Sequence, residues 1–150
     1  MRLFYYCYGR AHSSVVAGLI HLNRLPRDRV PNVNEIISAP GFDQSNQPDI
    51  GIPYFLGKDR HNNEVFIIGF GSAPDLGLQT IYYLLAQMGN PLEWKFYNSL
   101  ASIGWLTKIG GFISKKLKVS SIGKYLAALG IQNSYSSLVE LVKNVEENEQ

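Results

Sequence analysis

The sequence has few features that would cross-link it covalently or anchor it in a membrane. It contains a single cysteine among 150 residues, so no disulfide can form within the chain. We therefore expect a reducing, cytoplasmic location. The longest uncharged stretches, 11–23 and 76–92, contain polar residues and are shorter than the ~20 apolar residues of a membrane span. Arg10 interrupts the apolar start of the chain and no cleavage site follows it, so we expect no signal peptide.

The chain also lacks an excess of charge. The 14 Lys and Arg residues against 12 Asp and Glu leave a net charge of +2, which excludes a general polyanion binder. No nucleic-acid-binding motif is present, so we expect no specific nucleic-acid partner. The three histidines, His12, His21 and His61, are not joined by a cluster of cysteines or carboxylates. We therefore expect no metal site, and no cofactor motif is evident.

The composition is that of a folded domain. Hydrophobic residues make up 45% of the chain, aromatic residues 12% and charged residues 17%, which excludes disorder. A chain of this length is expected to form one domain and to bury a sizeable core without help from a metal. We expect a single domain over 1–150, with an acidic end at 146–150 that frays.

Strands and helices are predicted in alternation. The hydrophobic pattern indicates strands at 2–8, 52–57, 64–70 and 94–99, and helices at 15–25, 32–39, 72–88, 103–118, 121–129 and from 137 onward. Ser13, Ser72 and Ser137 are predicted helix caps, and Asn32 with Glu35 forms a predicted capping box. This order favours a layered α/β domain: a central parallel or mixed sheet of about four strands flanked by helices, with a helical C-terminal third.

The predicted helix at 72–88 has an apolar stripe that should face the core. Its members recur at helical spacing: Leu78, Ile81, Tyr82, Leu85 and Met88.

The loop between the first strand and the first helix carries most of the functional argument. It reads Cys7-Tyr-Gly-Arg-Ala-His-Ser-Ser14. In open α/β sheets, ligands bind at the carboxyl ends of strands, and a helix N-terminus there favours anions. The residues expected to contact such a ligand are Gly9, Arg10, His12, Ser13 and Ser14. The loop lacks the second glycine and the lysine of a Walker A box. Phosphate binding and a plain strand-to-helix turn both remain open.

Cys7 raises the question of catalysis. Its spacing to Ser13 and Ser14 resembles the C-x5-R-[ST] loop of cysteine phosphatases and the phosphocysteine loop of cellobiose-type sugar-transport IIB proteins. The resemblance implies that Cys7 accepts a phosphoryl group while loop amides hold its oxygens. Position 13 is Ser where the phosphatases have Arg, so their phosphate clamp is missing. Candidate general acids by residue type are Asp43, Asp49 and Asp75. The alternative is that Cys7 is a buried core residue, so whether the protein is an enzyme stays open.

Two further segments are candidates for function. Gly69, Gly71 and Ser72 form a second strand-to-helix loop that would lie near the first one if the strands are parallel. Residues 95–124 contain six lysines and no acid. The basic amphipathic segment 103–118 within this stretch favours a non-catalytic alternative, in which it meets a partner protein or an anionic membrane surface. A solvated charged face explains the same pattern without a function.

The chain as a whole resembles an uncharacterised family. The segments that carry the resemblance are Phe4-Tyr-Tyr-Cys-Tyr-Gly-Arg-Ala-His-Ser-Ser-Val-Val-Ala17, Asp49-Ile-Gly-Ile-Pro53 and Ile109-Gly-Gly-Phe-Ile-Ser114. They are similar to a domain-of-unknown-function family of spore-forming Gram-positive bacteria, over most of residues 1–130. The resemblance implies a small cytosolic bacterial protein and supplies no residue roles.

Overall fold

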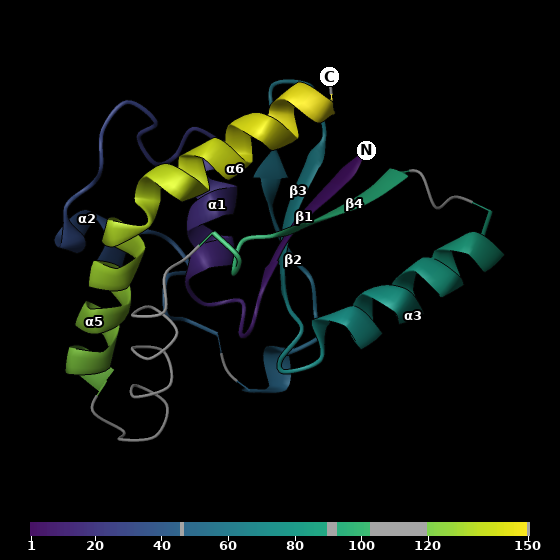
Figure 1. Cartoon of the computed structure of the whole chain (residues 1–150), viewed down its shortest axis with the longest axis horizontal. Helices are drawn as coiled ribbons and strands as arrows, with labels where there is room; N and C mark the ends of the chain where they lie inside the picture. Colours follow the sequence, from purple (N-terminus) through teal and green to yellow (C-terminus); the bar gives the residue numbers. More distant parts are fainter. Residues whose placement is uncertain (46, 90–92, 103–119, 150) are drawn as a thin grey trace.

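A computed structural model describes residues 1–45, 47–89, 93–102 and 120–149 (Figure 1). Its strands are β1 (Arg2–Cys7), β2 (Tyr54–Lys58), β3 (Glu64–Gly69) and β4 (Trp94–Asn98). Its helices are α1 (Ser13–His21), α2 (Val33–Ile37), the short 3-10 helix η1 (Gln47–Asp49), α3 (Pro74–Gln87), α5 (Ser120–Asn133) and α6 (Tyr135–Asn148). The predicted fold class is confirmed: a mixed four-stranded sheet is flanked by helices, and the C-terminal part is helical.

The sheet is built around β1. The strand order is β2-β3-β1-β4, and β1 pairs in parallel with both β3 and β4. At the edge of the sheet, β2 pairs antiparallel with β3. This is the hairpin that two apolar runs around the polar residues 58–63 predict. A strand with parallel neighbours on both sides is usually covered on both faces. All residues of β1 after Arg2 are accordingly buried.

The two faces of the sheet are covered by different helices. Leu3 and Tyr5 of β1 belong to a large core with α1, α5 and α6, whereas Phe4 and Tyr6 belong to a small core on which α3 packs. In Figure 1, α1 and α6 lie on one side of the sheet and α3 on the other. The chain therefore leaves β1 toward β3 through α1 and later crosses back over β1 to β4 through α3. The neighbouring ends of β1 and β4 form a topological switch point.

Helix α1 is the centre of the large core. All nine of its residues are buried because α1 lies between the sheet and α6. From α6, Tyr135, Leu138 and Val142 enter the same cluster. This burial agrees with the apolar character of the first helix on nearly every side.

The other face carries a row of phenylalanines. Phe55, Phe66, Phe4 and Phe96 lie in register across β2, β3, β1 and β4. The ring centroid of Phe4 lies 4.8 Å from that of Phe66 and 4.6 Å from that of Phe96, and both pairs are stacked. Cross-strand aromatic pairs of this kind add stability beyond the area that they bury.

The helix starts differ from several predictions. The capping box of Asn32 and Glu35 is confirmed. By contrast, Ser13 lies inside α1, which begins two residues earlier than predicted, after His12. The predicted caps Ser72 and Ser137 are also wrong. The cap positions are occupied instead by Ala73 for α3 and by Ser134 for α6, and neither residue makes a side-chain cap bond. The packing of each helix sets its start, and local cap preference contributes only about 1 kcal/mol.

The predicted inward face of α3 is wrong at one end. Leu85 is buried and Leu78 packs on the sheet, but the Met88 side chain, at the C-terminal end of the helix, is largely exposed.

Residues 146–148, where we expect fraying, are helical in α6, and Glu146 is held by Arg27 through two hydrogen bonds of 2.7 Å. The predicted basic helix 103–118 lies outside the described residues. In the described part of the chain, no helix has the length and apolar character needed to cross a membrane.

The core can be tested with two isoleucines of α5. Ile131 is fully buried, whereas Ile122 is largely exposed. We expect Ile131→Ala to lower the free energy of unfolding by about 2–5 kcal/mol, because it leaves a cavity. The matched change Ile122→Ala should stay within about 0.5 kcal/mol of the wild type. Urea denaturation measures both, and equal losses would contradict the placement of α5.

Candidate functional site

Three parallel strands end at one edge of the sheet, and their loops touch there. The amide of Phe70 donates to the Cys7 carbonyl at 3.0 Å, and the amide of Gly71 donates to the Tyr8 carbonyl at 2.8 Å. From β4, the Ser99 amide donates to the Tyr6 carbonyl at 3.0 Å. The structure thus brings the two predicted glycine-containing loops side by side, at the neighbouring carboxyl ends of β1 and β3.

Gly69 makes this contact sterically feasible. A Cβ atom at this position would lie 2.9 Å from the Arg10 amide nitrogen and 2.9 Å from the Tyr8 carbonyl oxygen. Both atoms belong to the backbone, so a side chain here would push the two loops apart. The third residue of the second loop, Ser72, is exposed before α3.

The hydroxyl groups of three serines gather at the start of α1. The Ser13 and Ser99 oxygens are 3.2 Å apart, and the Ser99 hydroxyl donates to the Tyr6 carbonyl at 2.8 Å. Because each hydroxyl has one proton, Ser13 is the donor to Ser99. The Ser14 oxygen lies 3.1 Å from the Cys7 sulfur. All three serines are buried, and so is the free thiol of Cys7.

Two side chains of the loop, Arg10 and His12, have acidic partners. Arg10 forms an ion pair with Asp49 at 3.2 Å and lies over the Tyr54 ring at 5.3 Å. His12 Nε2 lies 3.0 Å from a carboxylate oxygen of Asp43. Arg10 also has a φ of 56°, a left-handed conformation that is uncommon for a side chain of its size. These contacts turn both side chains toward the segment 42–54.

The helix N-terminus itself has no side-chain cap. His12 occupies the cap position, and its side chain makes no cap hydrogen bond to the first turn. The first-turn amides of a helix have no partner within the helix, and its dipole adds partial positive charge there. The arrangement therefore combines a polar helix start with the hydroxyl of Ser13 at the ends of β1 and β4.

Sequence reasoning missed two residues of this site. Ser99 is the last residue of the strand predicted at 94–99, and its proximity to the first loop could have been inferred from this position at a strand end. Ser45, whose hydroxyl donates to the Gly9 carbonyl, has no such signal. Of the candidate acids, Asp43 and Asp49 lie beside the loop as ion-pair partners, and Asp75 lies in the first turn of α3.

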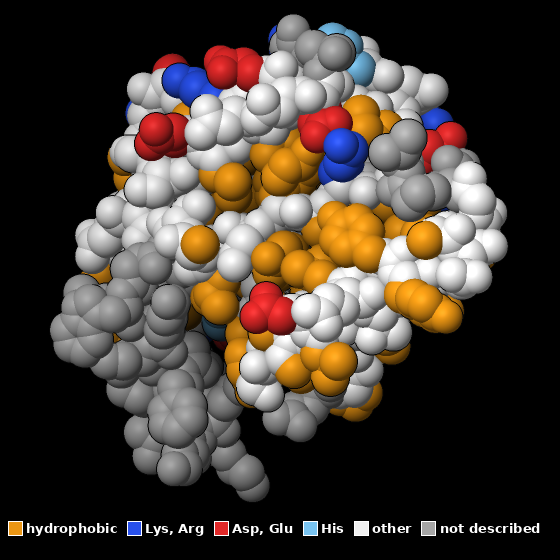
Figure 2. Space-filling model, turned by 45° about the vertical axis from the view of Figure 1, so that its right-hand side comes forward, with side chains coloured by type: hydrophobic (Ala, Val, Ile, Leu, Met, Phe, Trp, Pro, Cys, Tyr) orange, Lys and Arg blue, Asp and Glu red, His pale blue; other side chains and the backbone are white. Residues whose placement is uncertain are grey.

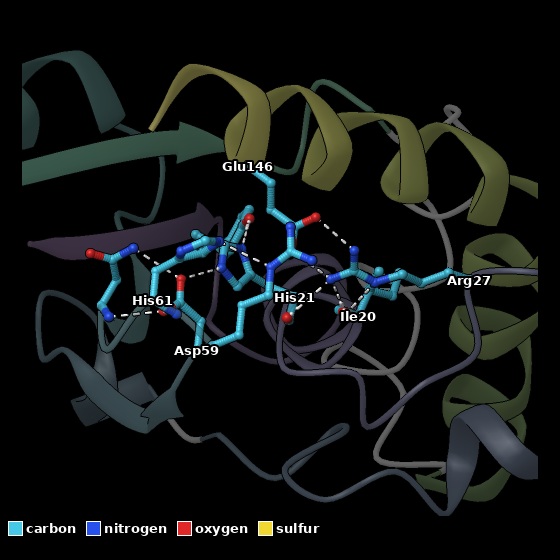
Figure 3. A network of polar contacts seen from close by, with 9 residues as sticks. Ile20, His21, Arg27, Asp59, His61 and Glu146 are labelled. Atoms are coloured by element: carbon cyan, nitrogen blue, oxygen red, sulfur yellow. Dashed lines mark hydrogen bonds and ion pairs between the residues drawn. The ribbon is translucent and has the colours of Figure 1, made fainter. Parts of the chain in front are cut away.

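A second polar cluster lies at the other end of α1, around its last residue His21 (Figure 3). His21 Nδ1 is 2.7 Å from the Tyr5 hydroxyl, and its Nε2 is 3.1 Å from Asp59. Burial alone would raise the pKa of Asp59. The hydrogen bonds from His21, from Asn63 and from the His61 amide outweigh burial and hold this pKa below its usual range. Burial likewise raises the pKa of Tyr5 well above its usual value.

Arg27 connects this cluster to α6. Its guanidinium donates to the carbonyls of Ile20 and His21 and forms a two-bond ion pair with Glu146. The hydrogen bonds from Arg27 lower the pKa of Glu146. Because these groups supply hydrogen-bond partners for one another, we interpret the cluster as structural.

A cavity elsewhere in the described residues does not involve the loop. A cavity of about 410 Å³ lies between residues 27–30 and α6. It contains none of the predicted site residues, and its two arginines are paired, Arg27 with Glu146 and Arg29 with Glu35. Within the described ranges, no group of three or more His, Cys, Asp or Glu residues could hold a metal ion.

The depressed pKa values of Asp59 and Glu146 predict a loss of stability in acid. A carboxyl whose pKa is lower in the folded than in the unfolded state contributes stability above the unfolded value, and this is lost as the pH falls through the folded value. The free energy of unfolding should therefore fall between about pH 5 and pH 2. Glu146→Gln should lose about 1.5–3 kcal/mol at pH 7, and its acid dependence should be shallower.

Urea denaturation as a function of pH tests this. The exposed Glu140→Gln in the same helix is the matched control and should follow the wild type. A Glu146→Gln profile parallel to that of the wild type would contradict the role of the Arg27 pair.

Comparison with known proteins identifies the family of the chain. The model of the family described as "Protein of unknown function (DUF3189)" matches residues 2–147. No curated protein and no solved structure matches the chain. The match begins with β1 and ends within the last turn of α6, and it confirms the expected resemblance to an uncharacterised domain family. The chain belongs to this DUF3189 family.

Proposed function

We propose that the loop 9–14 binds the phosphate group, or another anionic group, of a small molecule or nucleotide. The observation that carries the proposal is the place of the α1 N-terminus. It lies at the switch point between β1 and β4, and its cap residue His12 leaves the first turn without a side-chain cap. Ligands of open α/β sheets bind at this place, and helix N-termini there bind anions.

The side chains around the loop support an exchange of partners. Arg10 and His12 are each held by a carboxylate, so an incoming anion would replace Asp49 or Asp43 rather than neutralise an isolated charge. Arg10 can then bind two oxygens of a phosphate with its guanidinium fork. The Ser13 hydroxyl would turn from Ser99 to the ligand. Gly9 and the loop amides would approach the anion closely, as would the neighbouring turn of Gly69, Gly71 and Ser72.

A catalytic version assigns Cys7 as the nucleophile. The thiol loses its proton to solvent, and the thiolate attacks phosphorus while the bond from phosphorus to the leaving oxygen breaks. The His12–Asp43 pair supplies a proton to that oxygen. Water then attacks the phosphocysteine and returns a proton to the His12–Asp43 pair. The bond from phosphorus to sulfur breaks, phosphate is released, and the thiolate regains a proton from solvent. The Ser14 hydroxyl, 3.1 Å from the sulfur, would stabilise the thiolate as a donor.

The proposal includes the cellular location and the source of the protein. A free buried cysteine is consistent with a reducing cytosol, and the sequence resemblance adds a spore-forming Gram-positive source. A single domain over the whole chain completes this description. The alternative function, binding of a partner protein or an anionic membrane through segment 103–118, is based on sequence alone.

Ligand-dependent thermal stability tests anion binding. Inorganic phosphate, sulfate, nucleotides and sugar phosphates are the probes. A bound anion at ~100 times its dissociation constant should add ~2.7 kcal/mol to the free energy of unfolding. Ser13→Ala and Arg10→Ala should abolish the shift, because they remove a hydroxyl and a guanidinium from the loop.

Matched controls are available on the surface. Ser137→Ala and Arg24→Ala change the same residue types away from the loop and should keep the full ligand shift. The comparison is made within each variant, with and without ligand, so that altered intrinsic stability cancels. No shift with any anion, or a shift that survives Arg10→Ala and Ser13→Ala, would refute the binding site.

Cys7→Ser separates catalysis from binding. We expect it to abolish hydrolysis of p-nitrophenyl phosphate and formation of a phosphorylated protein, detected by mass spectrometry. The anion-induced thermal shift should remain, because the loop is otherwise intact. Activity that Cys7→Ser leaves unchanged would rule out the nucleophile, while binding would stand on its own test.

A further inference from the structure

Helix α3 exposes an apolar surface that the fold does not use. Asp75 is the single charged residue among its fourteen. Large apolar side chains point to solvent along its outer side, with exposed fractions of 65% for Leu76, 67% for Tyr83, 54% for Leu84 and 78% for Met88. A helix that is apolar on all sides is normally buried on all sides.

The inner side of α3 already serves the sheet. Leu78 packs against the small core of Phe4, and the Tyr82 ring meets Phe96 edge-on at 5.6 Å. Leu85 is the buried residue of the helix. Residues 76, 83 and 84 lie on the opposite side of the helix, because seven and eight residues return to the same face. Figure 2 shows hydrophobic side chains gathered over this part of the molecule.

We propose that the outer side of α3, formed by Leu76, Tyr83, Leu84 and Met88, is the interface of a homodimer. A large side chain presents on the order of 200 Å², so the four exposed fractions amount to about 500 Å² on each chain. Thr80 and Gln87 are exposed between them and uncharged. They extend this surface toward the ~800 Å² per partner of a stable interface.

The absence of charge favours a second copy over other occupants. No charged residue occurs from Leu76 to Gly89, so the surface has nothing to pair with a charged protein. A helix that lies on a lipid surface usually has lysines or arginines on its polar side, and α3 has none. Two α3 helices packed antiparallel about a twofold axis would bury the same patch on both chains, with their dipoles opposed.

Sedimentation equilibrium of the full chain tests the interface. From about 1 to about 200 µM protein, the wild type should pass from monomer to dimer by mass action. Tyr83→Glu combined with Leu84→Lys should raise the dimer dissociation constant by ~100-fold or more, because dimerisation would bury unpaired charges. The control is the same pair of changes in α5, Tyr125→Glu with Leu126→Lys, two neighbouring residues that are also exposed. The control should dimerise like the wild type.

The outcomes separate clearly. A wild type that stays monomeric over this range, or a dimer that the α3 substitutions leave intact, would overturn the proposal. Binding of the wild type to phosphatidylcholine vesicles that is lost with the α3 substitutions would overturn it in favour of a lipid surface. Circular dichroism shows whether the α3 variant is folded. That variant should keep the anion-induced thermal shift, so failure of the dimer and failure of the anion site remain distinguishable.

Discussion

The structure depends on the burial of one strand, β1, on both faces and along both edges. Parallel partners β3 and β4 satisfy its backbone, and its side chains alternate between two separate cores. A strand in this position needs a helical layer on each side, because both faces are apolar. Placing α1 and α3 on opposite faces follows from that requirement. The same crossing brings the loops after β1, β3 and β4 to one edge.

Because α1 is completely buried, its polar side chains also lie in the interior and need hydrogen-bond partners there. The helix takes Ser13, Ser14 and His21 into the interior, where a polar group without a partner is costly. Each of these side chains has a hydrogen-bond partner outside α1. Ser13 bonds to Ser99, Ser14 to Cys7, and His21 to Tyr5 and Asp59. These pairs tie the two ends of α1 to the sheet and to the hairpin turn.

The two sides of the sheet differ in how completely they are covered. On the α1 side, α5 and α6 add a second layer, and Arg27 connects α6 to the end of α1. On the other side, α3 is the one helix among the described residues that lies over the phenylalanine row, and Phe55 remains half exposed. The proposed anion site belongs to the edge of the sheet where β1, β3 and β4 end. The proposed interface belongs to the thinly covered face. The two proposals therefore rest on separate parts of the fold.

Local sequence was sufficient for the features that neighbouring residues determine. The run 2–8 predicts a buried central strand, the spacing of Asn32 and Glu35 predicts a capping box, and two apolar runs around a polar turn predict the hairpin. The four-stranded α/β class follows from the order of these elements. Each of these depends on hydrophobic period or on contacts within a few residues, which the chain carries wherever it is placed.

Only the tertiary structure decided the contacts between distant segments. Ser13 and Ser99 are 86 positions apart and meet because β4 pairs with β1, which no local pattern reveals. Asp43 and Asp49 became partners of His12 and Arg10 because the segment after α2 runs beside the first loop. Met88 fits an apolar helical stripe, yet it is exposed at the C-terminal end of α3. Strand order and layer width arise from the packing of the whole chain, so the sequence determined the elements and only packing decided which residues meet.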